Sequence, residues 1–495
     1  MSLTFTERSN NIESQTMIPR HRFVILTILV TACLATFVHV SSAADAKRPN
    51  IVMLLADDQR WDTLGCMGNE IIKTPNVDRL ASQGVVFDNV FVTTSICMTN
   101  RACIFTGQYA ARHGVIDFRT NFTPEQLSET YPGQLKQAGY HMGFIGKWGV
   151  GKPPENLFDY NKGWPGQNKY FPEKDDLSVH LTSHMGDQAI EFLDGTPDDR
   201  PFCLAFSFKA PHVQDGDPNT AVKIFTPEIR ALYDEFPGGF LHDPKLEHLY
   251  RNVVFPAPAL SNPAFFENLP EYFKPTETRK RWEWRFNTPE MYQRSMKAYY
   301  SLISGVDIVV GRIVKKLEEE GVLDNTVILY HGDNGFYLGE RGFAGKWYAH
   351  EPSLRVPLVI YDPRLPKAQK GTRRDQFALS IDLAPTMLDM AGIKRPERMQ
   401  GESLVPILNG ETPKWRDEFF YEHMFNIGTR IPRSIAVRGK QYKYIRYLVD
   451  DPRNEELYDF KADPDEANNL VDDPKYADLL KEMRAKLADW QERVQ

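Results

Sequence analysis

Two polar pairs in the sequence carry oxygen ligands that could share one metal ion. They are Asp57 and Asp58 in "LLADD", and Asp333 and Asn334 in "HGDNG". Neither pair has a cysteine or histidine at the spacing of a zinc site, and hard oxygen ligands suit calcium or magnesium. The residue types therefore predict a divalent ion of this class if the chain brings the two pairs together.

Several cations occur in short motifs that could balance this negative charge. They are Lys147 in "IGKWG", Lys209 in "FKAPH", Lys346 in "AGKWY" and Arg101 in "TNRAC", with His212 three residues after Lys209. A divalent ion with several cations around it could hold an anion. It could also stabilise the charge that develops during displacement at sulfur or phosphorus.

The nucleophile for such a displacement could be Cys97 in "SICMTNRACIFTG". Cys97 comes just before a helical pattern, and the N–H groups at the start of a helix favour a negatively charged centre. A thiolate is nevertheless a poor partner for a hard cation. A buried structural cysteine is the alternative for a lone cysteine in an apolar stretch.

The elements that must position these residues follow an alternating pattern. Four apolar runs end at the polar motifs: 51–56, 141–147, 202–212 and 326–334. Continuous apolar runs are typical of parallel strands buried on both faces, and predicted helices lie between them, as in "TPNVDRLASQG". The pattern predicts an α/β fold with a large, mostly parallel sheet sandwiched by helices. Because ligands bind at the carboxyl ends of such strands, the motifs should meet at one edge.

The chain divides into three predicted parts. Residues 1–46 form a signal peptide, and residues 47–405 form the α/β domain with an insertion at about 214–290 that is rich in proline and aromatic residues. Residues 406–495 form a smaller C-terminal subdomain. There, alternating aromatic-rich strands predict an antiparallel sheet, and "PKYADLLKEMRAKLADWQERV" predicts an amphipathic helix.

The predicted signal peptide indicates an exported protein, either periplasmic or secreted. A basic start is followed by an apolar run and a small-residue exit at Ser42, Ala43 and Ala44. The alternative is a lipoprotein, with Cys33 of "LVTAC" as the lipidated residue. No other segment is apolar enough to form a stable membrane span.

Composition excludes several other classes of function. The 495 residues carry a net charge of -7, which argues against a nucleic-acid-binding surface. Of five cysteines, four remain once the signal peptide is removed, and they are scattered along the chain. This is not a disulfide framework.

The stretch around Cys97 resembles the signature of the type I sulfatases, a family of the alkaline phosphatase superfamily. The signature reads Cys-x-Pro-x-Arg followed by Thr-Gly, and Cys97, Arg101, Thr106 and Gly107 match it. The resemblance extends over about residues 47–480 and includes "NIVMLLADD", "GKWG", "KAPH", "HGDNG" and "GKWYAHEPSLRVP". It implies an alkaline phosphatase-like fold.

The resemblance also implies a covalent modification and a metal. Cys97 would be oxidised to Cα-formylglycine by a formylglycine-generating or sulfatase-maturing enzyme, and the hydrated aldehyde would be the nucleophile. Calcium, or magnesium, would bind to the two polar pairs: Asp57, Asp58, Asp333 and Asn334.

The remaining motif residues take roles by the same resemblance. Arg101 would steady the formylglycine, and Lys147, Lys209 and Lys346 would hold the sulfate oxygens. His212 would lie near the leaving-group oxygen as a general acid.

Two residues depart from the family pattern. Thr99 stands at the proline position that the maturing enzymes read, and Gly149 stands where relatives commonly carry a histidine that assists the release of sulfate. His350 or His331 could replace that histidine, because both flank segments that must reach the site. We accordingly place His350 among the substrate-binding residues.

These observations predict an exported, calcium-dependent sulfatase acting on a sulfated polysaccharide or oligosaccharide, or on a small sulfate ester. The aromatic residues of the insertion suit sugar rings but could equally be core: Trp282, Trp284, Phe286 and Tyr292. The alternatives are a phosphonate or phosphate ester hydrolase of the same superfamily, and a catalytically impaired glycan-binding relative.

Overall fold

The computed structural model describes residues 48–171, 178–214 and 239–495. The predicted signal peptide, Cys33 and part of the predicted insertion lie outside the described residues. No helix in the described ranges combines the length and the apolar character that crossing a bilayer requires.

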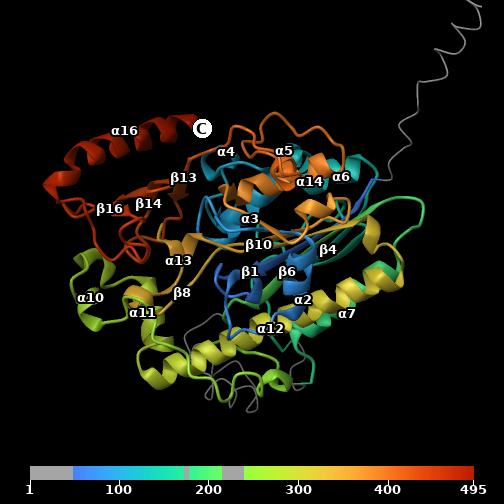
Figure 1. Cartoon of the computed structure of the whole chain (residues 1–495), viewed down its shortest axis with the longest axis horizontal. Coiled ribbons are helices and arrows are strands. Elements are labelled where there is room, and N and C mark those ends of the chain that lie inside the picture. The colour runs from blue at the N-terminus through green and yellow to red at the C-terminus, as the bar shows by residue number, and fades with distance from the viewer. Residues whose placement is uncertain (1–47, 172–177, 215–238) are drawn as a thin grey trace, which may run out of the picture. The chain divides into compact units, whose positions relative to one another are not determined.

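A central sheet of eight strands organises the fold (Figure 1). In spatial order the strands are β11 (Thr372–Arg374), β2 (Val85–Phe87), β10 (Leu358–Tyr361), β7 (Thr326–Gly332), β1 (Asn50–Asp57), β6 (Phe202–Pro211), β4 (His141–Lys147) and β5 (Tyr160–Trp164). Within this sheet only β10 runs antiparallel to its neighbours. The predicted mostly parallel sheet is confirmed.

Helices cover both faces of the sheet, as the alternating pattern predicts (Figure 1). One face carries α2 (Pro75–Gln83), α7 (Leu181–Asp194) and α12 (Pro289–Glu319), and the other carries α3 (Cys97–Thr106), α6 (Tyr131–Gln137) and α14 (Leu383–Met390). Strand β1 is buried along its whole length and contributes side chains to the two hydrophobic cores, one on each face of the sheet. Val52 and Leu54 join the core under α12, whereas Met53 and Leu55 join the core under α3. A continuous apolar run is therefore what this position requires.

The C-terminal region forms the predicted antiparallel sheet and helix. Its four strands pair in chain order: β13 (Glu418–His423), β14 (Ser434–Gly439), β15 (Tyr442–Tyr447) and β16 (Glu455–Asp459). Helix α16 (Ala477–Arg493) buries Leu480, Met483 and Leu487 in the same hydrophobic core that holds α3 and α14. Because this core is shared, residues 48–495 form one compact unit.

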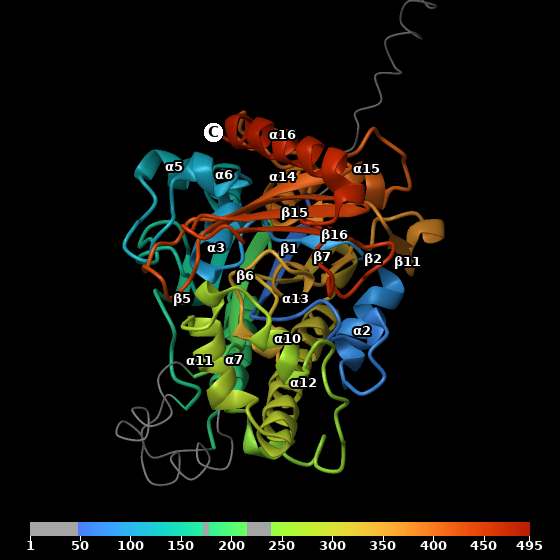
Figure 2. The same ribbon diagram turned by 90° about the vertical axis from the view of Figure 1, so that its left-hand side faces the viewer.

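The described part of the predicted insertion lies between α12 and the C-terminal sheet (Figure 2). It contains α10 (Pro263–Glu267) and α11 (Glu277–Arg285). The aromatic residues considered above mainly pack: Phe286 is buried, the Arg279 guanidinium lies over Trp282, and Tyr292, which belongs to α12, donates a hydrogen bond to the Pro256 carbonyl. Short elements complete the described fold: β3 (Val90–Phe91), α4 (Ala110–His113), α5 (Pro124–Glu129), β8 (Tyr337–Leu338), β9 (Ala344–Gly345), α13 (Glu351–Leu354), β12 (Ala378–Leu379) and α15 (Val405–Leu408).

Candidate active site

The carboxyl ends of β7, β1, β6 and β4 meet at one edge of the sheet, and the two polar pairs meet there. The Asp58 backbone N–H donates to Asp333 Oδ1 at 3.0 Å, and Asn334 Nδ2 donates to Asp58 Oδ1 at 2.6 Å. Asp58 has φ 69°, a left-handed conformation that costs a non-glycine residue energy. Its carbonyl accepts from the Tyr299 hydroxyl at 2.7 Å, which helps to hold this conformation.

The donor set at this edge fits a hard divalent cation. At this edge, three buried side-chain oxygens have no hydrogen-bond partner within the described residues: Asp57 Oδ1, Asp58 Oδ2 and Asn334 Oδ1. Buried polar atoms are rarely left without a partner, and oxygens of this kind are the ligands that calcium prefers. Ligand atoms of Asp57, Asp333 and Cys97 also lie within 4.8 Å of one another. The side chain at position 97 therefore lies directly beside the proposed ligands.

Buried cations interleave with these carboxylates. Arg101 contacts Asp333 Oδ2 through Nε at 2.9 Å and Nη2 at 2.8 Å. Lys147 Nζ lies 2.6 Å from Asp57 Oδ2, and Lys346 Nζ contacts Asp58 Oδ1. The site is thus a closely packed set of opposite charges that is nearly excluded from solvent.

The neighbouring charges separate the pKa values of two of the carboxyls. Burial raises the pKa of Asp57, but Lys147 and the other nearby cations outweigh burial and hold the pKa well below its usual range. Burial, with the adjacent Asp57 carboxylate, raises the pKa of Asp333 to about 6. For Lys147, burial is the largest single effect and lowers the pKa, but attraction to Asp57 and the other nearby negative groups together outweighs it, so the net shift is upward and the amine stays charged.

Helix α3 positions Cys97 and Arg101 together. Cys97 is the first residue of α3, and all ten residues of this helix are buried. Arg101 follows one turn later and therefore lies on the same face of the helix as Cys97. Asn100 Nδ2 donates to the Asp333 carbonyl at 2.6 Å and so connects α3 to the end of β7. The helix ends at Gly107, whose φ of 64° suits the left-handed cap.

A cavity of about 350 Å³ opens above this cluster. Cys97, Lys147, His212 and Lys346 line it, and its volume falls within the ~300–1,000 Å³ range of small-molecule sites. His212 Nδ1 lies 2.8 Å from the Val213 carbonyl, and Nε2 lies 3.5 Å from Asp58 Oδ2. The cavity lining therefore combines two lysine ammonium groups with one histidine.

Gly149 forms part of the cavity wall and contacts Arg101. It has φ 83°, and a Cβ at this position would lie 2.6 Å from Arg101 Cδ. Glycine is required twice over, by the backbone conformation and by the close approach of the guanidinium side chain. The Arg101 side chain can therefore occupy its observed position only because position 149 carries glycine and no larger side chain.

Two predicted substrate-binding residues do not line the cavity. Lys209 Nζ donates to Gln167 Oε1 at 3.2 Å and to the Val213 carbonyl at 3.1 Å. Gln167 itself lines the cavity and lies 3.5 Å from Asp57 Oδ2, so Lys209 is one residue removed from it. Gln167 was not among the predicted site residues, because it follows Pro165-Gly166 and belongs to none of the motifs.

The expectation for His350 must be corrected. Its Nδ1 lies 2.6 Å from the Tyr337 hydroxyl, and its Nε2 lies 2.9 Å from Glu456 Oε2. Tyr337 of β8 therefore engages Nδ1 and Glu456 of β16 engages Nε2, so both ring nitrogens are bound away from the cavity. His331 is also buried outside the cavity lining, with Nδ1 2.9 Å from the Pro357 carbonyl. Neither histidine takes the place of the missing one at Gly149.

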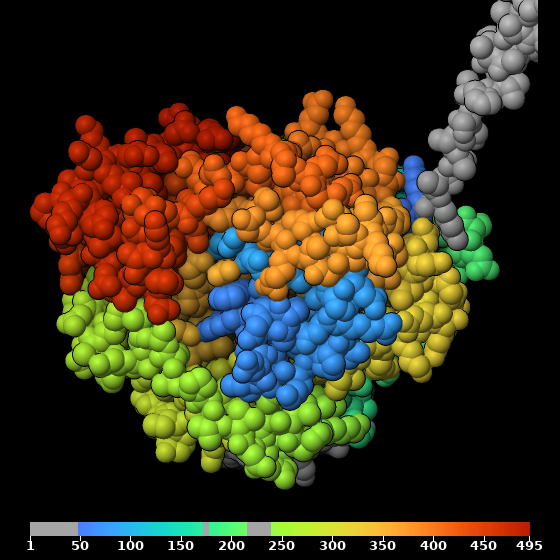
Figure 3. All heavy atoms as spheres, viewed as in Figure 1, coloured from blue at the N-terminus to red at the C-terminus, as the bar shows by residue number. Residues whose placement is uncertain are grey.

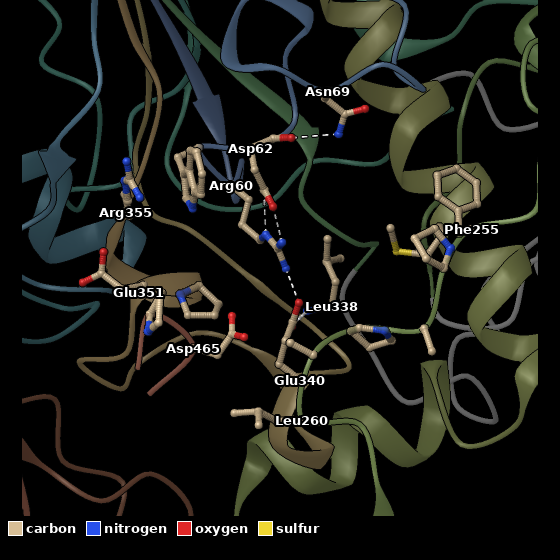
Figure 4. A pocket seen from close by; sticks show the side chains of 18 of the residues that line it. Arg60, Asp62, Asn69, Phe255, Leu260, Leu338, Glu340, Glu351, Arg355 and Asp465 are labelled. Carbon is tan, nitrogen blue, oxygen red and sulfur yellow. Dashed lines mark hydrogen bonds and ion pairs between the residues drawn. The ribbon is translucent and has the colours of Figure 1, made fainter. Parts of the chain in front are cut away.

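A second, larger cavity of about 830 Å³ lies elsewhere on the molecule (Figure 4). Figure 3 shows its opening as a hollow among the N-terminal, 255–300 and C-terminal segments. Arg60 bridges Asp62 and Glu340 there, and the Arg355 guanidinium lies 3.8 Å above the Trp61 ring. None of the predicted catalytic residues lines this cavity. We therefore assign the reaction to the smaller one.

Comparison with protein families gives two matches that together span the described chain. The family model "Sulfatase" matches residues 49–393, and the model "N-sulphoglucosamine sulphohydrolase, C-terminal" matches residues 339–493. The first match contains the polar pairs, Cys97, the cavity lysines and His212.

Individual relatives agree with the family models. An N-acetylglucosamine-6-O-sulfatase of Bacteroides thetaiotaomicron is 32% identical over 91% of this chain and 87% of its own length. The N-sulphoglucosamine sulphohydrolase of Homo sapiens is 27% identical over 93% of both chains. A solved structure of a protein in complex with its substrate D-glucosamine-2-N,6-O-disulfate superposes with a TM-score of 0.74 at 28% identity. It covers 90% of this chain and 98% of the other. The fold, the site and these matches show that the chain belongs to the sulfatase family, whose members hydrolyse sulfate esters.

Proposed function

We propose that the protein is an exported, calcium-dependent sulfatase for sulfated glycosaminoglycan saccharides, with Cys97 converted to formylglycine. The observation that carries this proposal is the position of Cys97, beside the partnerless ligand oxygens and within a cavity lined by Lys147 and Lys346. The substrate class is supported by the names of the relatives from Bacteroides thetaiotaomicron and Homo sapiens. Export is supported by the predicted signal peptide.

Four side chains would hold the calcium ion, or magnesium in its place: Asp57, Asp58, Asp333 and Asn334. When bound, the ion supplies positive charge to the sulfate oxygens and to the nucleophile, and the modified residue 97 supplies an oxygen nucleophile. The three oxygens without hydrogen-bond partners support this assignment, because a bound ion would satisfy them.

The cavity residues would bind and orient the sulfate ester. Lys147 and Lys346 each contact one carboxylate oxygen, and their remaining N–H donors can bind sulfate oxygens. Arg101 keeps Asp333 in place and offsets its charge. Because these groups are fixed before substrate arrives, they stabilise the transferring sulfuryl group without reorganisation.

His212 is the group best placed to move a proton. Donation from Nδ1 to the Val213 carbonyl fixes the ring, and Nε2, which lies 3.5 Å from Asp58 Oδ2 on the cavity side, would face the leaving-group oxygen. Of the histidines in the described chain, only His212 lines this cavity. Proton transfers that relatives divide between two histidines would therefore fall to His212 and water.

The decisive experiment combines mass spectrometry with matched variants. We expect the peptide containing residue 97 to carry the aldehyde in protein from the native host, and Cys97→Ala to abolish turnover of an aryl sulfate while the thermal unfolding temperature is kept. Cys103→Ala is the control, because Cys103 lies on the same buried helix but contacts His113 instead of the cavity. An active enzyme with an unmodified thiol at position 97 would refute the proposal. An aryl phosphate with the same leaving group tests the phosphate ester alternative.

A further inference from the structure

A salt-bridged triad of Glu277, Arg281 and Arg430, outside the predicted motifs, lies on the wall of the Cys97 cavity. All three residues line this cavity. Arg281 Nε lies 2.9 Å from Glu277 Oε1, and Arg430 Nη2 lies 2.6 Å from Glu277 Oε2. Glu277 and Arg281 come from α11, whereas Arg430 comes from the segment between β13 and β14. The insertion and the C-terminal region thus complete a cavity whose floor belongs to the central sheet.

The triad retains positive charge and unused donors. Two guanidinium groups face one carboxylate, which leaves a net charge of about +1. Each guanidinium uses one nitrogen on Glu277, and within the described ranges neither Arg281 nor Arg430 has another hydrogen-bond acceptor. Glu277 is 6% exposed, so its carboxylate anchors both arginines from a buried position. The two arginine side chains are therefore held in place by Glu277, and each keeps N–H donors that can bind a ligand.

The position of the triad fits a group on the same ligand as the scissile sulfate. The Arg281 guanidinium lies 5.0 Å from the centre of the Trp347 ring, and Trp347 directly follows Lys346, which lines the sulfate-binding floor. Apolar side chains line the cavity as well, among them Phe118 and Phe425. Aromatic faces of this kind suit a saccharide ring. A ring held there could present one substituent to the lysines and another to the arginines.

Guanidinium groups bind carboxylates and sulfates through parallel hydrogen bonds. We propose that Arg281 and Arg430 bind a second anionic substituent of the substrate, a sulfate or a carboxylate. The scissile sulfate meanwhile lies at Lys147 and Lys346. The inference rests on the proposed function and narrows the substrate class to saccharides with at least two anionic groups. A purely structural role is the alternative, because the Glu277 N–H also donates to the Arg430 carbonyl at 2.8 Å.

The test compares substrates that differ by one anionic group. kcat and KM are measured for N-acetyl-D-glucosamine 6-sulfate, for D-glucosamine-2-N,6-O-disulfate and for N-acetyl-D-glucosamine 6-sulfate linked to a uronic acid. Arg281→Ala should raise KM for the doubly anionic substrates by about tenfold or more, the loss expected for a charge-assisted hydrogen bond. KM for the monosulfated sugar should change little. Comparing the effect on the disulfate with the effect on the uronate shows whether the arginines prefer a second sulfate or a carboxylate.

Two further variants keep the test decisive. Arg430→Ala should act in the same direction with a smaller effect, because the Arg430 side chain is 62% exposed. Lys280→Ala is the matched control, since Lys280 is an exposed cation of the same helix that lies over Trp284 and not in the cavity. The inference would be overturned if both arginine variants kept the wild-type ratio of KM for the doubly anionic substrates to KM for the monosulfated sugar, with turnover of the monosulfated sugar intact. Absence of turnover on every sulfate ester in the wild-type protein would instead overturn the proposed function.

Discussion

Replacement of Gly149 by alanine should damage the active site through Arg101. The added Cβ would lie 2.6 Å from Arg101 Cδ, about 1 Å inside normal contact, so the buried guanidinium side chain must move. The left-handed backbone at φ 83° adds about 1–2 kcal/mol for a non-glycine residue. Disturbing one charged hydrogen bond of Arg101 adds about 1.5–3 kcal/mol. We therefore expect a total loss of about 2.5–5 kcal/mol in the free energy of unfolding.

The displacement of the Arg101 side chain should affect turnover more strongly than it affects the free energy of unfolding. A shift of about 1 Å in a positioned group can cost about 100-fold in turnover, and we expect a loss of this order for an aryl sulfate. Gly139→Ala is the matched control: Gly139 has φ 90°, but a Cβ there has no neighbour within 4 Å. Calorimetry and steady-state kinetics on both variants separate the backbone cost from the Arg101 contact. Wild-type turnover in Gly149→Ala would refute the claim that Arg101 must stay where it is.

Three further predictions follow from the described contacts. Asp58→Asn keeps the side-chain shape but removes a ligand charge, so calcium per chain by elemental analysis should fall and turnover should fall at least ~10-fold; unchanged metal content would contradict the assignment. His350→Ala should lower the free energy of unfolding by about 1.5–3 kcal/mol through its lost contacts with Tyr337 and Glu456. Its KM should be unchanged, and a raised KM would restore His350 to the substrate site. Burial lowers the pKa of His423 to about 3, so below about pH 6.5 the unfolded chain binds a proton that the folded chain excludes. Stability should therefore fall on acidification, and His423→Phe should reduce the slope by about 1.4 kcal/mol per pH unit in urea titrations.

The sequence was sufficient to predict the sheet edge because its signals are local. The apolar run before Asp57 has no polar position, and β1 is indeed buried on both faces. The run before Asp333 gives β7, which pairs with β1 in parallel. The four-residue spacing from Cys97 to Arg101 is one helical turn, and α3 places both at the cluster. In each case the residues that make up the pattern lie within a few positions of one another, and the rule that parallel strands share one carboxyl edge supplies the contact between distant segments.

The residues that were missed or misplaced depend on contacts between distant segments. His350 lies only four residues after Lys346, but its ring bonds to Glu456 on β16, and sequence spacing says nothing about that partner. Glu277 and Arg430 are 153 residues apart, and each looks like an ordinary charged surface residue when taken alone. Only the packing of the C-terminal sheet against the insertion brings them into the cavity.

The complete burial of α3 has a consequence for the order of events in biosynthesis. Cys97 is 4% exposed, and every residue of its helix is enclosed by the folded chain. A maturing enzyme that reads position 99 must reach Thr99 as well as the thiol, and Thr99 is buried in the finished fold although Cys97 borders the cavity. The proposed modification must therefore precede the packing of α3 onto the sheet. The folding rate and the supply of maturing enzyme would then jointly decide what fraction of molecules can become active.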